Sequence, residues 1–192
     1  MKNKGLLVVI SGPAGTGKGT VVKELAKDEN IRVSVSATTR APRAGEVGGV
    51  HYHYLSREQF KDMIAEDGFL EYAEYCGNFY GSPKKQADEW KQEGKDVILE
   101  IEVQGCMQVK QNDPECISIF IMPPSVEELE SRLRGRGTET EEVILKRLER
   151  AKEEMKLSKD YDYIVVNDTV EECVKDIAAV LRAEKLRAKR FA

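Results

Sequence analysis

The sequence lacks any apolar run long enough to cross a bilayer, since the longest one, Leu6 to Ile10, is a short segment. The opening residues Met1 to Lys4 also lack the apolar core of a secretory signal. Neither membrane insertion nor export is indicated, so we expect a cytoplasmic location and no membrane partner.

Cysteine spacing carries no metal or disulfide signal. The chain contains no CxxC or mixed Cys/His pattern among its four cysteines, which are Cys76, Cys106, Cys116 and Cys173. Zinc binding and a disulfide framework are therefore not expected, and we interpret these residues as buried or incidental thiols.

Positive charge is not in excess, because the net charge of the 192 residues is −4. This disfavours general nucleic-acid binding. The basic tail from Arg182 to Arg190 lacks interleaved aromatic residues, so we interpret it as the solvated face of a last helix.

Short apolar runs rich in Val and Ile alternate with longer helical stretches, which is typical of a parallel α/β domain. Apolar residues make up 41% of the chain and charged residues 33%, as expected of one globular domain. Five strands are predicted, at Gly5 to Ser11, Ile31 to Ser36, Val97 to Glu102, Cys116 to Met122 and Tyr163 to Val166. Helices are predicted from about Lys18 to Lys27 and from starts near Val103, Ser125 and Thr169. The pattern predicts a doubly wound parallel sheet flanked by helices.

Two segments interrupt this rhythm, and no internal repeat is visible. Residues 37–95 resemble an insertion that builds a site, and within them Gly49 to Leu55 alternates like a half-exposed strand. Residues 126–158 are highly charged with helical spacing, and Gly135-Arg136-Gly137 is expected to be a flexible break between two helices. We therefore divide one domain into a core (about 1–36, 96–125 and 159–192), an insertion (about 37–95) and a helical arm (about 126–158).

A phosphate-binding motif follows the first predicted strand. Ser11 to Thr20 contains GxxxxGK between a strand and a helix, the context that this motif needs. Glycines let backbone N–H groups turn towards phosphate oxygens, the helix start favours an anion, and Lys18 can reach the β- and γ-phosphates. The predicted ATP contacts in this loop are Gly12, Pro13, Ala14, Gly15, Thr16, Gly17, Lys18, Gly19 and Thr20.

Position 19 of the loop is glycine, where Ser or Thr is usual. Two alternatives stay open for the Mg²⁺ that accompanies ATP. Either Thr20 supplies the missing hydroxyl, or the ion is held mostly through water.

An arginine pair predicts a second phosphate site. Arg40 and Arg43 are three residues apart in a segment that Pro42 keeps from forming a regular helix, and arginine suits bidentate contact with a phosphate dianion. Tyr52 and Tyr80 could add hydroxyl donors, although surface charges and tyrosines of a small core would explain the same residues.

Several ordered motifs together resemble guanylate kinases over nearly the whole chain. They are T-T-R-x-x-R-x-G-E-x-x-G-x-x-Y from Thr38, Glu71, Gly77 to Ser82, Glu100 to Gly105, and Arg132 to Arg147, in addition to the phosphate loop. The resemblance implies a P-loop NTPase core with a GMP-binding insertion and a mobile helical lid. It also implies GMP-binding roles for Ser36, Arg40, Arg43, Glu46, Tyr52, Glu71, Tyr80, Ser82 and Glu100.

The resemblance assigns further residues to ATP and to the transferring group. Arg132, Arg136 and Arg147 would close over the phosphates, although ordinary surface ion pairs with neighbouring glutamates would also explain this arm. Asn167 resembles the family's contact on the adenine side. The groups expected to neutralise charge during transfer are Lys18, Arg43, Arg136 and Arg147.

Three carboxylates are expected to recognise the base of GMP or to hold the metal ion. Guanine presents N1–H and N2–H as adjacent donors that one carboxylate can accept together, so Glu71 or Glu100 is a suitable reader; Ser36, Ser82 or an arginine could donate to O6. Glu100 and Glu102 end a predicted strand on one face, with Glu100 expected towards guanine and Glu102 towards Mg²⁺ or its waters. Capping of the next helix is the alternative for Glu102.

These inferences predict an ATP:GMP phosphotransferase of purine nucleotide metabolism, acting on GMP and dGMP with Mg²⁺, and with no nucleic-acid partner. Two alternatives stay open. Gly12 to Gly15 also resembles cytidylate and adenylate kinases, and guanylate kinase-like domains occur as non-catalytic scaffold modules.

Overall fold

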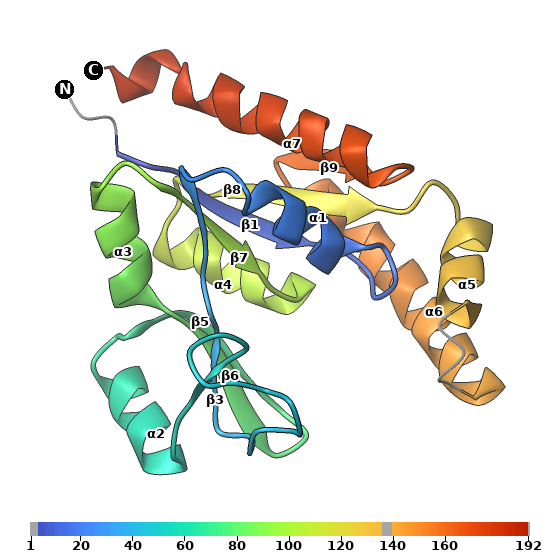
Figure 1. Ribbon diagram of the computed structural model, residues 1–192, viewed down its shortest axis with the longest axis horizontal. Coiled ribbons are helices and arrows are strands. Elements are labelled where there is room, and N and C mark those ends of the chain that lie inside the picture. The colour runs from blue at the N-terminus through green and yellow to red at the C-terminus, as the bar shows by residue number, and fades with distance from the viewer. Residues whose placement is uncertain (1–3, 136–139, 192) are drawn as a thin grey trace.

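A five-stranded parallel sheet with helices on both faces forms the centre of the molecule (Figure 1). The computed structural model describes residues 4–135 and 140–191. In spatial order the strands are β2 (Ile31–Val33), β7 (Asp96–Glu100), β1 (Leu7–Ser11), β8 (Ile117–Met122) and β9 (Tyr163–Val166). Every neighbouring pair is parallel, which confirms the predicted doubly wound sheet. The first four predicted strands are shorter than expected, and β7 ends at Glu100, before Glu102.

Alternate residues of strand β1 pack into two different cores, one on each face of the sheet. The strand is therefore apolar at every position and appears in the sequence as a continuous apolar run. Leu6, Val8 and Ile10 face one cluster with helices α1 (Lys18–Leu25) and α7 (Val170–Lys185). Leu7 and Val9 face a second cluster with helices α3 (Lys84–Gln92) and α4 (Val103–Asn112). Helix α3 therefore packs on the central sheet, although it lies within the predicted insertion.

A smaller sheet forms the rest of the insertion, with strand order β4 (His53–Tyr54), β3 (Ala37–Thr38), β6 (Asn78–Pro83) and β5 (Phe69–Tyr75). Helix α2 (Arg57–Ala65) covers it through Phe60, whose ring stacks on Phe69 and Phe79. The strand predicted over Gly49 to Leu55 was wrong in extent. Gly49 has a φ of 77°, and Tyr52 and Gly48 form an isolated bridge, so the chain turns until His53.

The charged arm contains two helices, α5 (Val126–Arg134) and α6 (Glu141–Lys156), joined by a segment outside the described residues. A separate apolar cluster joins the helices and consists of Leu129, Leu133, Ile144, Leu148 and Ala151. Helix α5 starts near Ser125 as expected, and Ser125 caps it, because its Oγ accepts the Glu128 N–H. Helix α5 ends at Arg134, and Arg136 and Gly137 lie outside the described residues.

The basic tail makes more contacts than a solvated face would. Helix α7 is followed by a short 3₁₀ turn (Ala188–Arg190). Lys185 Nζ lies 2.6 Å from the buried Asp96 carboxylate, and Arg190 donates to the Lys4 carbonyl. The tail therefore holds the edge of the core as well as facing solvent, which corrects the expectation.

All four cysteines are free thiols, and only Cys76 is exposed. A further short 3₁₀ turn spans Leu157–Asp160 after α6. Within residues 4–135 and 140–191, no helix combines the length and the apolar character needed to cross a membrane.

Candidate active site

The phosphate loop leaves β1 at Ser11 and enters α1 at Lys18. Gly12 has a φ of 148°, and a Cβ on it would lie 2.3 Å from the Ile121 carbonyl oxygen, so only glycine fits there. Thr16 Oγ1 donates to the Pro13 carbonyl at 2.9 Å and closes the turn. Lys18 Nζ donates to the carbonyls of Gly12 and Pro13, so the loop holds this ammonium group above its own backbone.

A cavity of about 630 Å³ lies over this loop. Most of the ATP contacts predicted in the loop line it, namely Ala14, Gly15, Gly17, Lys18, Gly19 and Thr20. Gly12, Pro13 and Thr16 are buried and do not line the cavity. Lys23, Glu24 and Glu100 complete the lining.

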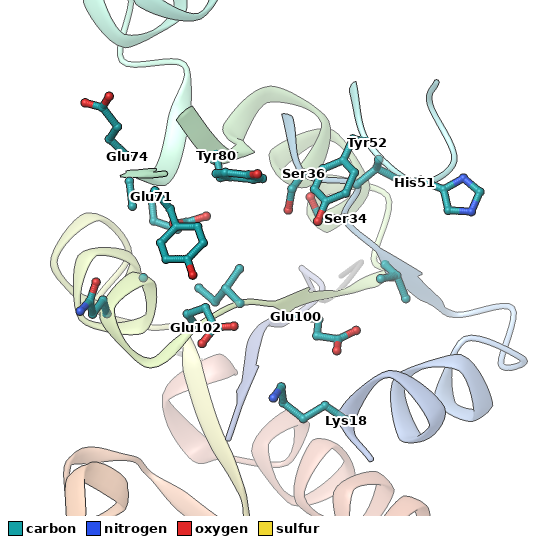
Figure 2. Close-up of a pocket in the computed structure, with 18 of the residues that line it drawn as sticks. Lys18, Ser34, Ser36, His51, Tyr52, Glu71, Glu74, Tyr80, Glu100 and Glu102 are labelled. Atoms are coloured by element: carbon teal, nitrogen blue, oxygen red, sulfur yellow. The ribbon is translucent and has the colours of Figure 1, made fainter. Parts of the chain in front are cut away.

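A second cavity, of about 950 Å³, lies between the two sheets. Figure 2 shows Glu71, Tyr80, Ser36 and Tyr52 on one side of it, and Lys18 with Glu100 on the other. Lys18 and Glu100 line both cavities. The two spaces therefore meet at one ammonium group and one carboxylate.

Glu71 is the buried carboxylate of the second cavity, with 8% of the residue exposed. It pairs with Ser82 across β5 and β6, and the Ser82 hydroxyl donates to Glu71 Oε1 at 2.7 Å. Burial raises the pKa of Glu71, while the Ser82 hydrogen bonds partly oppose that rise. Glu71 thus faces the second cavity and does not lie on an exposed strand edge. Ser82 does not line the cavity, but its hydroxyl holds the Glu71 carboxylate.

The predicted arginine pair is arranged around a carboxylate. Arg40 Nη2 donates to both Glu46 oxygens, at 2.9 and 3.0 Å, and Glu46 Oε2 also accepts the Arg43 N–H and the Tyr54 hydroxyl. These hydrogen bonds, the one from Arg40 first, lower the pKa of Glu46 to about 2. The Arg40 guanidinium lies 5.5 Å from the centre of the Tyr52 ring.

Arg40, Arg43 and Glu46 stand beside Tyr52 and do not line the cavity itself. Glu46 is therefore placed to orient Arg40. No motif in the sequence singles out Tyr54, whose hydroxyl completes this group.

The two acidic residues after β7 have different surroundings. Glu100 faces Lys18, and partial loss of solvent raises its pKa while the Lys18 ammonium opposes the rise. Glu102 lies beyond the strand, and one of its oxygens is 3.4 Å from Arg150 Nη2. Glu102 is the N-cap residue of α4, and its carbonyl accepts the Gly105 N–H at 3.0 Å, but its side chain makes no capping hydrogen bond. The capping alternative therefore stays open only as the effect of a negative charge near the helix start.

Arg132 connects the arm to the core. Its Nη1 donates to the Asn167 carbonyl at 3.0 Å, and its Nη2 donates to the Asp168 carbonyl at 3.3 Å. Asn167 is 2% exposed, and its Nδ2 donates to the Thr16 carbonyl of the phosphate loop at 2.6 Å. These two predicted ATP residues therefore meet at the phosphate loop.

The remaining arginines of the arm separate into distinct environments. Arg134 pairs with Glu130 and Glu141 on the surface, whereas Arg147 is half-buried on α6. Arg150 lines the second cavity and bonds Glu154 at 2.7 Å. Arg136 lies outside the described residues.

Sequence reasoning missed several residues of the second cavity, among them Ser34, His51, Tyr75 and Gln104, and it left the role of Arg150 open. Gln104 follows the acidic strand end, so its position at the carboxyl edge of the sheet could have indicated it. His51 lies in a turn and Tyr75 is the last residue of β5, and neither has a comparable signal in the sequence.

The residues predicted at Mg²⁺ lie in different cavities, with Thr20 in the phosphate-loop cavity and Glu102 in the other. Within the described ranges, no three His, Cys, Asp or Glu side chains come together as a metal site. An ion that keeps most of its ligands as water and phosphate oxygen fits this sparse donor set.

Comparison with known proteins agrees with this geometry. Residues 4–184 match the family model described as guanylate kinase. The chain is 58% identical to the guanylate kinase of Halalkalibacterium halodurans, over 99% of this chain and 94% of that protein. It is 52% identical to the guanylate kinase of Desulfitobacterium hafniense, over 98% and 95%.

A solved structure, guanylate kinase from Anaplasma phagocytophilum, superposes with a TM-score of 0.78 at 37% identity and covers 98% of this chain and 90% of that one. The chain therefore belongs to the guanylate kinase family.

Proposed function

We propose that this chain transfers the γ-phosphoryl group of ATP to GMP, and also to dGMP, giving ADP and the corresponding diphosphate, and that it serves purine nucleotide metabolism in the cytoplasm. The observation that carries the proposal is the meeting of two cavities at Lys18 and Glu100. One cavity lies over a phosphate loop and the other contains a buried carboxylate, so a donor and an acceptor nucleotide would approach end to end.

Base selection falls to Glu71 rather than to Glu100. Glu71 is buried beside Ser82, away from the phosphate loop, whereas Glu100 faces the Lys18 ammonium. A carboxylate can accept guanine N1–H and N2–H together, and a base lacking these donors would leave it unpaired. Ser36 lines the same cavity and has a hydroxyl that could donate to O6.

The acceptor phosphate would lie near Tyr52 and Tyr80, where Arg40 is already oriented by Glu46. Arg43 is anchored next to it through its backbone N–H, and its exposed side chain is available to the ligand. Two arginines and two tyrosine hydroxyls suit a phosphate dianion.

The phosphates of ATP would bind at the phosphate loop. Asn167 would lie towards the adenosine end of ATP, and Arg132 would link Asn167 to the helical arm. Residues 126–158, which include Arg147 and the undescribed Arg136, would close over the phosphates. Closure would exclude water and limit ATP hydrolysis.

Mg²⁺ would be held by Thr20, which lines the phosphate-loop cavity, and by Glu100, which borders both cavities. When bound with ATP, it supplies positive charge to the phosphate oxygens. Glu102 would not contact the ion directly, since its carboxylate pairs with Arg150.

In the reaction, a phosphate oxygen of GMP attacks the γ-phosphorus, and the bond from that phosphorus to the bridging oxygen of ADP breaks. The attacking oxygen is already ionised, so no general base is needed. Alignment and charge neutralisation therefore supply the catalysis, with Lys18 at the meeting point of the cavities.

A coupled ADP-release assay with GMP, dGMP, AMP, CMP, UMP and dTMP tests the proposal. We expect GMP to give the highest kcat/KM. Equal or better turnover of a monophosphate without guanine would instead favour the alternative of a different nucleotide kinase, and ATP-independent binding of GMP without turnover would favour a scaffold module.

A further inference from the structure

We propose that one face of helix α4 sets the specificity of the acceptor site by fixing the position of Glu71. This guide face consists of Gly105, Gln108 and Asn112, which are spaced i, i+3 and i+7 and therefore lie on one side of the helix. The inference rests on the proposed function, because it concerns the carboxylate assigned to guanine.

The two amide side chains of the guide face hold the backbone on either side of Glu71. Gln108 Oε1 accepts the Tyr72 N–H at 3.1 Å, and Asn112 Nδ2 donates to the Leu70 carbonyl at 2.9 Å. β5 belongs to the small sheet, whereas α4 packs on the central sheet. These hydrogen bonds therefore fix the register between the strand that carries Glu71 and the core that carries Lys18 and Glu100.

Gly105 determines the space available to the carboxylate itself. A Cβ at this position would lie 2.9 Å from Glu71 Oε2 and 3.1 Å from Ile101 Cδ1. The other oxygen, Oε1, is held by the Ser82 hydroxyl. Glycine is unfavourable within a helix, so its presence here has a packing reason, namely room for Oε2.

The two oxygens of Glu71 are thus positioned by different means, one by a hydrogen bond from Ser82 and one by the missing side chain of residue 105. In Figure 2 Glu71 lies on the Tyr80 side of the cavity, opposite Lys18. A methyl group at residue 105 would push Oε2 away and tilt the carboxylate. The tilted group would keep one hydrogen bond to guanine and lose the other.

The substitution Gly105→Ala tests this inference. We expect the KM for GMP to rise about tenfold, as for the loss of one hydrogen bond to a charged group. The KM for ATP should change less than about twofold, because the phosphate loop is untouched. IMP lacks the 2-amino group, so the preference for GMP over IMP should also fall, a change that a general loss of stability would not produce.

The wild-type protein, assayed in parallel, separates two failures. No GDP from the wild type would overturn the proposed function. GDP from the wild type together with an unchanged GMP KM and an unchanged GMP:IMP ratio in Gly105→Ala would overturn the role of the guide face.

Gln108→Ala provides a second test in case the glycine variant folds poorly. Gln111→Ala is the matched control, an exposed glutamine on the same helix. We expect Gln108→Ala to raise the KM for GMP at least threefold, as for a lost neutral hydrogen bond, and Gln108→Glu, which keeps an acceptor oxygen, to restore it in part. If Gln108→Ala and Gln111→Ala have the same KM for GMP and the same GMP:IMP ratio, the positioning role of Gln108 is wrong.

Discussion

Replacing Glu71 with Gln should change activity and stability in opposite directions. The substitution keeps the shape of the side chain. It also keeps an oxygen that can accept the hydrogen bond from the Ser82 hydroxyl, which is 2.7 Å long in the wild-type protein. It removes the negative charge and places an NH₂ group where guanine presents its own donors. The variant therefore loses the base contact without losing the side-chain volume.

The activity loss follows from the number of hydrogen bonds affected. A hydrogen bond to a charged group contributes about 1.5–3 kcal/mol, and Glu71 is expected to accept two from guanine. Even if only one is lost, kcat/KM for GMP should fall roughly 10- to 150-fold. The KM for ATP should stay within about a factor of two, because the phosphate loop lies elsewhere.

The stability change has the opposite sign because burial raises the pKa of Glu71. A carboxyl whose pKa is raised on folding stabilises the folded state at low pH, and that contribution is lost as pH rises through the folded pKa. At pH 7 the ionised Glu71 therefore costs free energy of folding. Gln carries no such cost, so Glu71→Gln should unfold at a denaturant concentration equal to or higher than that of the wild type.

Steady-state kinetics with GMP and ATP, combined with urea unfolding at pH 7, measure both effects. Glu66→Gln, an exposed residue after α2, is the control and should change neither. Unchanged GMP kinetics in Glu71→Gln would refute the assignment of Glu71 to the base. A clear loss of stability at pH 7 would refute the argument that the buried charge is a cost.

Three further predictions concern the phosphate loop and the Arg40 group. Lys18→Ala should lower kcat by about 10³-fold or more while GMP binding, measured by calorimetry, survives, and retained turnover would contradict the role of the loop. Gly12→Ala should lower Tm by about 5 °C or more, because the new Cβ would meet the Ile121 carbonyl at 2.3 Å, and an unchanged Tm would contradict the packing argument. Glu46→Gln should destabilise the protein at pH 7, because Arg40 chiefly lowers the pKa of Glu46 to about 2 in the folded state. In urea titrations the stability difference from the wild type should shrink as pH falls from about 4.5 towards 2. A pH-independent difference would argue against this role of the Glu46 charge.

The central sheet could be predicted from the sequence because its strands are buried on both faces. Val8 and Val9 face different cores, so the strand has no polar face and reads as a continuous apolar run. The starts of two helices could also be predicted from the sequence. Ser125 and Thr169 each cap the helix that follows, with side chains that accept the N–H three residues on.

The insertion was harder to predict because long-range contacts decide its local structure. Gly49 to Leu55 alternates in sequence like a strand, yet only His53 and Tyr54 pair in the sheet, and the positive φ of Gly49 sets the turn before them. The site residues were largely indicated by motif, but their partners were not. That Glu46 holds Arg40, and that Arg150 reaches Glu102, depends on side chains brought together by tertiary packing.

One measurement tests most directly the claim that a donor and an acceptor nucleotide meet at Lys18 and Glu100. Purified protein is incubated with Mg²⁺, GMP and ATP labelled in its γ-phosphate, and the products are separated and counted. We expect ADP and GDP in equal amounts, with the label in the β-phosphate of GDP. Label found only in inorganic phosphate, or no GDP at all, would contradict it.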